Sequence, residues 1–109
     1  MEAEELKELF EAAEANDEFS KFDRIAESVR RSRRSDLCAM IYLHERFAGH
    51  EGIAGTRRMI AGAEHDVIWL DYGSSNKYFM EQITHEDVVY LSRCGVMWDD
   101  EYEFLSMFV

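Results

Sequence analysis

The spacing of apolar residues changes near the middle of this chain, and that change constrains the fold more than any other feature of the sequence. In residues 2–15, apolar side chains recur at intervals of three and four, which predicts an amphipathic helix. Residues 67–70 instead form a short apolar run between two aspartates, which is typical of a buried strand. Helices followed by strands indicate the α+β class.

Two more helices are predicted in the first half of the chain. Residues 18–32 end in a basic run, which suits the negative end of a helix dipole. Their apolar face would consist of Phe19, Phe22, Ile25, Ala26 and Val29. Residues 36–48 predict another helix, which Gly49 would end. Its core stripe would consist of Leu37, Met40, Ile41, Leu43 and Phe47.

The second half predicts one helix and a small sheet. Residues 49–66 are looser, with a single helical turn after Thr56, and residues 77–82 fit either a strand or a helical turn. Thr84 is a helix N-cap with an acid three residues later, and Gly95 is suited to close that helix. The last strands are expected at 96–98 and 102–109, joined by a turn at 99–101.

The length of 109 residues suits one domain spanning 1–109. We expect N-terminal amphipathic helices to pack against a small antiparallel sheet that includes a C-terminal β-hairpin. Residues 1–16 could instead stand apart as a separate acidic helix. No apolar stretch approaches the roughly 20 residues of a membrane span, and the N-terminus is acidic where an export signal would be basic. A cytoplasmic protein without a membrane partner is therefore expected.

The charge is strongly negative and unevenly distributed. The chain has 23 acids and 12 bases, a net charge of −11. The acidic surplus lies in residues 1–20 and 59–109, whereas residues 21–58 are mildly basic. Such a charge repels nucleic acid and attracts basic surfaces. The arginines of residues 30–34 could touch phosphates, but we expect them to pair with acids of the same chain.

Catalytic and metal-binding signatures are weak. A metal site built from His44, His50 and His65 is one interpretation of the histidines, each of which precedes an acid, but the spacing lacks HExxH. Surface histidines are the other interpretation. Cys38 and Cys94 are expected to be free, buried thiols. The sequence thus predicts a protein that is not an enzyme and needs no metal or cofactor.

Two acidic clusters are the candidate partner-binding residues. On the first helix they are Glu4, Glu8 and Glu11, and at the hairpin tip they are Asp99, Asp100 and Glu101. Trp98 and Tyr102 flank the tip and would anchor an interface if they are exposed. Residues of the chain's own core and a solvated turn are the alternative interpretation.

Four segments of the chain resemble small proteins encoded by bacteriophages and prophages. They are FDRI (22–25), RSDLCAMIYLHERF (34–47), AEHDVIWLD (63–71) and ITHEDVVYLSRCGVMWDDEYEFLSMFV (83–109), about two-thirds of the chain. In size, acidity and lack of a catalytic motif the chain is also similar to anti-CRISPR proteins. The resemblance implies a bacterial host cell and an inhibitor whose acidic surfaces occupy the basic nucleic-acid-binding site of a CRISPR-Cas complex.

The sequence is also compatible with two other functions. The chain could be a self-associating structural or regulatory adaptor, monomeric or homodimeric, because its first helix has an apolar face that needs cover. It could also be a metal-dependent hydrolase that uses the pairs of histidine and acid.

Overall fold

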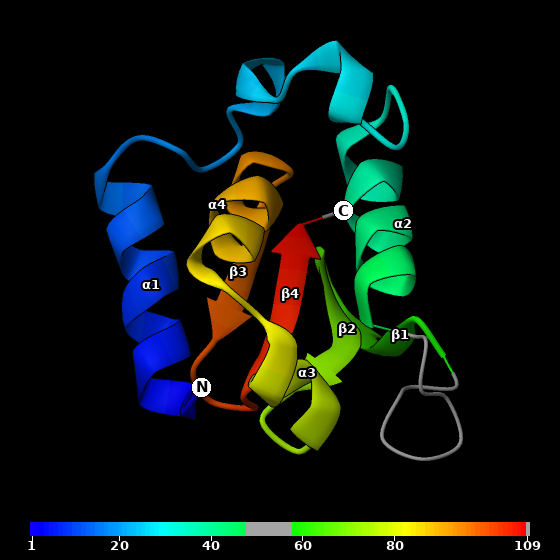
Figure 1. Cartoon of the computed structure of the whole chain (residues 1–109). Coiled ribbons are helices and arrows are strands. Elements are labelled where there is room, and N and C mark those ends of the chain that lie inside the picture. Colours follow the sequence, from blue (N-terminus) through cyan, green and yellow to red (C-terminus); the bar gives the residue numbers. More distant parts are fainter. Residues whose placement is uncertain (48–57, 109) are drawn as a thin grey trace.

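A computed structural model describes residues 1–47 and 58–108 (Figure 1). The α-helices are α1 (Ala3–Ala15), α2 (Ser35–Phe47), α3 (Lys77–Gln82) and α4 (His85–Arg93). Two short 3₁₀-helices, η1 (Phe22–Arg24) and η2 (Glu27–Val29), precede α2. The strands are β1 (Ile60–Glu64), β2 (Val67–Gly73), β3 (Val96–Asp99) and β4 (Phe104–Phe108). The α+β class is confirmed.

The strands form one antiparallel sheet in the order β1-β2-β4-β3. β3 and β4 are the predicted C-terminal hairpin, although β4 begins at Phe104 rather than at Tyr102. β1 was not predicted, because its sequence, IAGAE, contains a glycine and little β-branched material. It is held in the sheet by pairing with β2, so cross-strand contacts decide its conformation.

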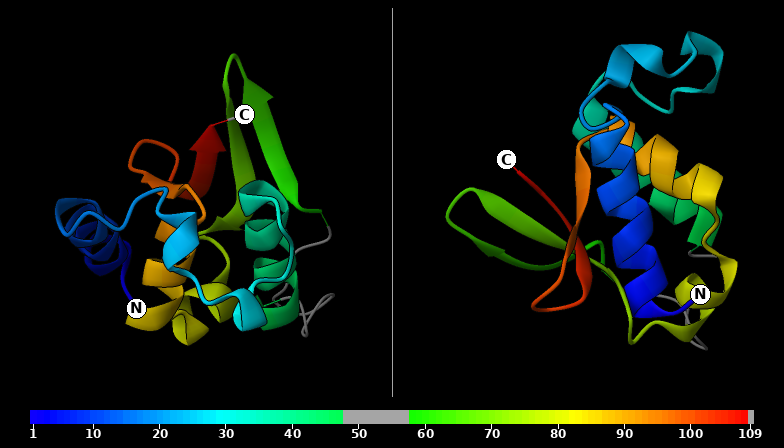
Figure 2. Two further views of the ribbon diagram at one scale, coloured as in Figure 1. Left: turned by 90° about the horizontal axis from the view of Figure 1, so that it is seen from above. Right: turned by 90° about the vertical axis from the view of Figure 1, so that its left-hand side faces the viewer.

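The helices lie on one side of this sheet (Figure 2). On that side the strands contribute buried residues with two-residue alternation, including Leu70, Tyr72 and Leu105. α1 contributes Leu6 and Phe10 to the same hydrophobic core. The acidic N-terminal helix therefore shares a single core with the sheet, and it lies along α4 and β3.

The prediction of a helix over residues 18–32 is wrong. The backbone has positive φ at Asp17 and Ser20, and the chain then makes only the short turns η1 and η2. Of the predicted apolar face only Ile25 is buried, while Val29 is 46% exposed. The segment is held instead by contacts with α4: Ser20 N–H donates to the carbonyl of Ser92, and the Tyr90 hydroxyl donates to the carbonyl of Val29.

The core stripe of α2 is also different from the prediction. Leu37 is 43% exposed, whereas Cys38 and Ala39 are fully buried together with Leu43 and Phe47. Small residues therefore face the core near the start of α2, where Cys38 Sγ lies 3.1 Å from the hydroxyl of Tyr90 on α4. Leu43 and Phe47 are buried as predicted, but Leu37 is not, because the close approach of α2 to α4 at this end favours small side chains.

Residues 77–82 are helical, and Asn76 caps them by accepting a hydrogen bond from Phe79 N–H. Gly95 has φ of 93°, a left-handed conformation that glycine adopts without strain, so it closes α4 as predicted. Gly73 permits a close approach of strands: a Cβ there would lie 2.3 Å from the carbonyl oxygen of Glu103. The predicted end of α2 at Gly49, the turn after Thr56 and the last residue, Val109, lie outside the described residues.

The predicted N-terminus of α4 is confirmed, and the carboxylate of Asp87 in its first turn also joins α4 to α2. Asp87 Oδ2 accepts hydrogen bonds from the backbone N–H and the hydroxyl of Thr84. Its Oδ1 accepts from the Tyr42 hydroxyl and from Arg46 Nε, both on α2. Asp87 is only 3% exposed, so these partners replace the water that a buried carboxylate has lost.

Replacing Asp87 by Ala should lower the free energy of unfolding by about 2–3 kcal/mol, because it removes a helix cap and charge-assisted hydrogen bonds to α2. Urea titration followed by circular dichroism measures the change. Glu86→Ala is the matched control: it removes an exposed acid from the same helical turn and should change stability by less than about 0.5 kcal/mol. Equal effects of the two substitutions would contradict this role of Asp87.

Candidate partner-binding surface

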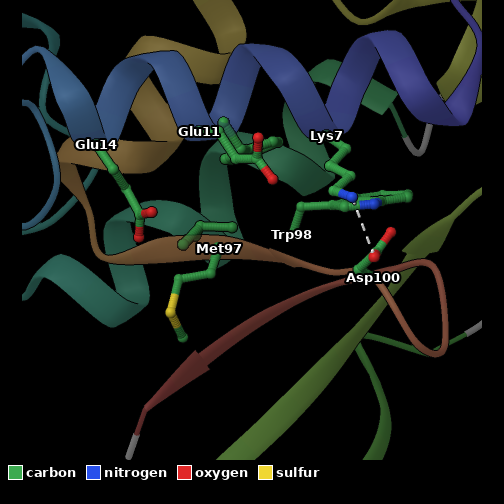
Figure 3. Close-up of a pocket in the computed structure, with 8 residues that line it drawn as sticks. Lys7, Glu11, Glu14, Met97, Trp98 and Asp100 are labelled. Carbon is green, nitrogen blue, oxygen red and sulfur yellow. Dashed lines mark ion pairs between the residues drawn. The ribbon is translucent and has the colours of Figure 1, made fainter.

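A groove between α1 and β3 brings together one residue of each predicted acidic cluster, Glu11 and Asp100 (Figure 3). Lys7, Glu11 and Glu14 extend from α1 toward the groove, and Trp98 and Asp100 line it from the hairpin. Its volume is about 140 Å³, which is small beside the roughly 300–1,000 Å³ of sites that enclose small molecules. Phe10, Val96 and Met97 also line it, so it is a small surface groove of mixed apolar and acidic lining that a partner's side chains could contact.

Lys7 is the one base in this groove, and it already has a partner. Its Nζ lies 3.2 Å from Asp100 Oδ2. The hydrogen bond and the charge of Asp100 raise the pKa of Lys7 above its usual value, and the nearby charges of Glu4 and Glu11 raise it further. The ammonium group thus stays charged at neutral pH and joins α1 to the hairpin tip, leaving the surrounding glutamates without a base.

The predicted residues on α1 all lie on the surface, with different relations to the groove. Glu4, Glu8 and Glu11 are exposed, but only Glu11 lines the groove. Glu14 also lines it and was not predicted as a site residue. Its position three residues after Glu11, one helical turn along the same face, was the sequence signal that could have found it.

The predicted hairpin residues divide between different environments. Asp100 and Glu101 are exposed at the turn, as an acidic binding tip requires. Trp98 is half-buried and lines the groove. It also packs against the hydrophobic core, so it contributes to the stability of the fold as well as to the groove. Tyr102 is 54% exposed and lies on the other side of the hairpin, against Trp69 of β2, with ring centroids 5.5 Å apart.

Asp99 is turned inward and holds the hairpin together. One carboxylate oxygen accepts the Trp69 indole N–H at 2.8 Å, and the other accepts the backbone N–H groups of Glu101 and Tyr102. Burial favours the protonated form, but these hydrogen bonds outweigh it, so the pKa of Asp99 lies below its usual value. The carboxylate fixes the positions of two aromatic residues and has little capacity left for a partner.

The bases elsewhere in the molecule are largely neutralised by acids of the same chain. Of the 11 Lys and Arg residues within 1–47 and 58–108, eight form ion pairs with carboxylates. Arg31 pairs with Glu45 and Arg34 with Asp36, as expected for the basic run. By contrast, none of the exposed glutamates of residues 2–14 forms an ion pair within the described chain. A run of six unpaired glutamates therefore lies within residues 2–14.

The described residues offer little support for metal or thiol chemistry. His44 lies on α2 and His65 in the β1–β2 turn, and His50 falls outside the described ranges. Within 1–47 and 58–108, no three His, Cys, Asp or Glu side chains are grouped so that they could hold a metal ion. Cys38 and Cys94 are buried free thiols. Burial, and then the neighbouring Cys38, raises the pKa of the Cys94 thiol, which disfavours a nucleophilic thiolate.

In the part of the chain that the structure describes, no helix is long and apolar enough to span a membrane. Comparisons with protein-family models, with curated proteins and with solved structures found no significant match. The case for a function therefore depends on the chain's own geometry and charge.

Replacing Asp99 by Ala should lower stability at about pH 6 by roughly 1 kcal/mol, because three hydrogen bonds at the hairpin tip are lost. Since the folded-state pKa of Asp99 is depressed, its stabilising contribution is present above the unfolded-state pKa and is lost as the pH falls through the folded-state value. The difference between wild type and variant should therefore shrink at about pH 3.

Urea titrations of both proteins at the two pH values measure this difference. Asp100→Ala is the control, because Asp100 makes one ion pair at the surface and should contribute little. A stability difference for Asp99→Ala that stays constant with pH would contradict the role assigned to its ionised carboxylate.

Proposed function

We propose that this protein is a non-enzymatic binding protein that recognises a basic surface on a partner protein. In its specific form, it is a phage-type inhibitor that covers the nucleic-acid-binding site of a bacterial CRISPR-Cas complex in the host cytoplasm. The observation that carries the proposal is the meeting of two acidic elements at one edge: α1 lies beside the hairpin, and none of its exposed glutamates forms an ion pair in the described part of the chain.

Electrostatics support this proposal in two ways. A negative surface speeds encounter with a positive one and disfavours partners of the same charge. Surfaces that hold nucleic acid are rich in Lys and Arg, because they must neutralise phosphates. An acidic protein can compete for those residues. The same argument disfavours direct nucleic-acid binding by this chain.

A second candidate function, self-association, is favoured by the sheet face opposite the helices. Phe108 and Tyr102 are 61% and 54% exposed, and both lie on or beside that face. However, Glu64, Asp71 and Glu103 lie on or beside the same strands, so two copies would bring like charges together. We therefore favour a partner of opposite charge.

Reversing three charges at the acidic edge should abolish inhibition while leaving the fold intact. The variant replaces Glu11, Glu14 and Glu101 by Lys; all three are exposed, and none of their side chains forms an ion pair in the described structure. Plasmid interference by CRISPR-Cas complexes co-expressed with the protein is the measurement. Wild type should relieve interference, and the variant should lose at least about tenfold of that effect through unfavourable charge contacts.

The control replaces Glu27, Glu81 and Glu86 by Lys. These acids are also exposed and unpaired, they lie on η2, α3 and α4, and they give the same change in net charge. This control should inhibit like wild type. Equal loss in both variants would mean that only net charge matters, and full activity of the Glu11, Glu14 and Glu101 variant would refute the acidic edge.

Self-association, the second candidate function, can be tested by the molecular mass in solution. Light scattering after size-exclusion chromatography should show a monomer of 12.8 kDa at low salt, because charge repulsion opposes pairing of the sheet faces. A stable dimer at low salt, lost in a Phe108→Ser variant, would favour the self-associating adaptor and count against an inhibitor that acts as a monomer.

A further inference from the structure

The sheet face opposite the helices carries an aromatic pocket. Trp69 and Tyr102 form two of its walls, with ring planes at 86° to each other, and Phe104 completes the aromatic lining. Ala61, Gly62 and Glu64 of β1 line the rest. The pocket has a volume of about 180 Å³, enough for one long side chain rather than for a folded segment.

The pocket is held in shape by hydrogen bonds beneath it. Asp99 accepts from the Trp69 indole and from the Tyr102 backbone, so one carboxylate fixes both aromatic residues. Gly62 faces Trp69 across the β1–β2 pair and, lacking a side chain, leaves the space in front of the indole ring empty. A pocket that exists before binding spares the ligand the free energy of ordering it.

The surroundings of this pocket are negative. Residues 60–76 and 95–108, which contain the strands and their turns, include no Lys or Arg. They include seven carboxylates, of which Asp71 pairs with Arg58 and Asp100 with Lys7, while the other five form no ion pair with Lys or Arg in the described structure: Glu64, Asp66, Asp99, Glu101 and Glu103. Aromatic faces attract cations, and the attraction is stronger where carboxylates lie nearby. The chemistry of the pocket therefore favours a cationic guest over an anionic or neutral one.

On the helical side of the molecule, aromatic rings are in contact with arginine side chains of the same chain. Arg30 lies over the ring of Phe22 at 4.8 Å, Arg31 over Tyr42 at 5.9 Å, and Arg46 over Phe47 at 5.0 Å. The groove between α1 and the hairpin likewise contains the chain's own cation, Lys7. On the sheet side, the strands contain no Lys or Arg, and Arg58, which precedes β1, is paired with Asp71.

We propose that the pocket formed by Trp69, Tyr102, Phe104 and Glu64 receives an arginine side chain of the partner protein. A guanidinium group is planar, so it can stack on a ring and donate hydrogen bonds to the Glu64 carboxylate at the same time. This inference deepens the proposed function and rests on it for the nature of the partner. The arginine would anchor the partner on the face that the acidic edge of α1 does not reach.

The test uses a short probe, acetyl-Gly-Arg-Gly-amide, added to the isotope-labelled full chain. The indole N–H signals of the two tryptophans report on two different places, because Trp69 lines the pocket and Trp98 lines the groove beside α1. The Trp69 signal should move saturably and the Trp98 signal should stay in place.

A citrulline peptide of the same length is the matched ligand control, since it keeps the shape and loses the charge. It should bind at least about fivefold more weakly, the size expected for a partly solvated cation–π contact. Tyr102→Ala should weaken binding of the arginine peptide by about fivefold, and Glu64→Gln by about threefold.

Gly62→Val fills the pocket without removing any contact. Gly62 has no positive φ, and a Cβ there would meet Trp69 at an ordinary 3.6 Å, so the variant should fold and fail to bind. Phe108→Ala, on the same face but outside the pocket, should bind like wild type. Equal binding of the arginine and citrulline peptides, movement of Trp98 alone, or unchanged affinity in Gly62→Val would each overturn the proposal.

The same titration separates this proposal from the proposed function. The variant with Lys at positions 11, 14 and 101 keeps every residue that lines the pocket. If it binds the arginine peptide but wild type inhibits no CRISPR-Cas complex, the pocket stands and the inhibitor proposal fails. If wild type inhibits but its Trp69 signal does not respond to the peptide, the inhibitor proposal stands and the arginine pocket fails.

Discussion

In residues 1–47 and 58–108, the sheet is packed on one face only, and the rest of the structure depends on this constraint. A chain of 109 residues can build one hydrophobic core, and here the helices supply it from a single side of the four strands. Because successive side chains of a strand point to opposite faces, every second side chain lies on the face away from the helices. Those outer positions include Trp69, Phe104 and Phe108, so an aromatic surface remains outside the described core. Acidic residues surround this aromatic surface, and their negative charges oppose its association with a second copy of the chain.

The charged side chains also contribute to the packing of the chain. The basic residues of the middle segment pair with nearby acids and cover aromatic rings, so they stabilise the connection over α4 that the chain makes without a long helix. Glu18 shows this most directly: it accepts from Arg24 and Arg93, whose hydrogen bonds lower its pKa, those from Arg93 contributing most. After these pairs form, the negative charge that remains is concentrated on α1 and around the hairpin.

The sequence predicted the features that depend on local chemistry. The caps at Thr84 and Gly95, the first helix and the C-terminal hairpin all follow from short-range rules of spacing and turn chemistry. The errors occurred where tertiary contacts override those rules. Residues 18–32 have helical spacing, but their backbone bonds to Ser92 and Tyr90 select an extended path over α4. β1 has weak strand propensity and exists because β2 pairs with it.

The candidate site was predictable only in part, for a similar reason. Exposed acids on α1 and at positions 100 and 101 could be expected from charge alone. The inward turn of Asp99 could not, because it requires knowing that Trp69, 30 residues earlier, lies across the sheet from it. Glu64 and Gly62 were missed as pocket residues because they belong to the strand that local propensity did not indicate.

The hairpin tip connects the two surfaces that we propose as contacts for a partner. Asp100 reaches α1 through Lys7, while its neighbour Asp99 reaches Trp69 on the other face of the sheet. Successive side chains at the end of a strand point to opposite faces, so two adjacent acids can order two different surfaces. A four-residue strand and its turn thereby fix both the groove and the aromatic pocket. A partner with a basic ridge could contact both surfaces across this narrow edge, and its specificity would then depend on the distance between its cationic side chains as well as on their number.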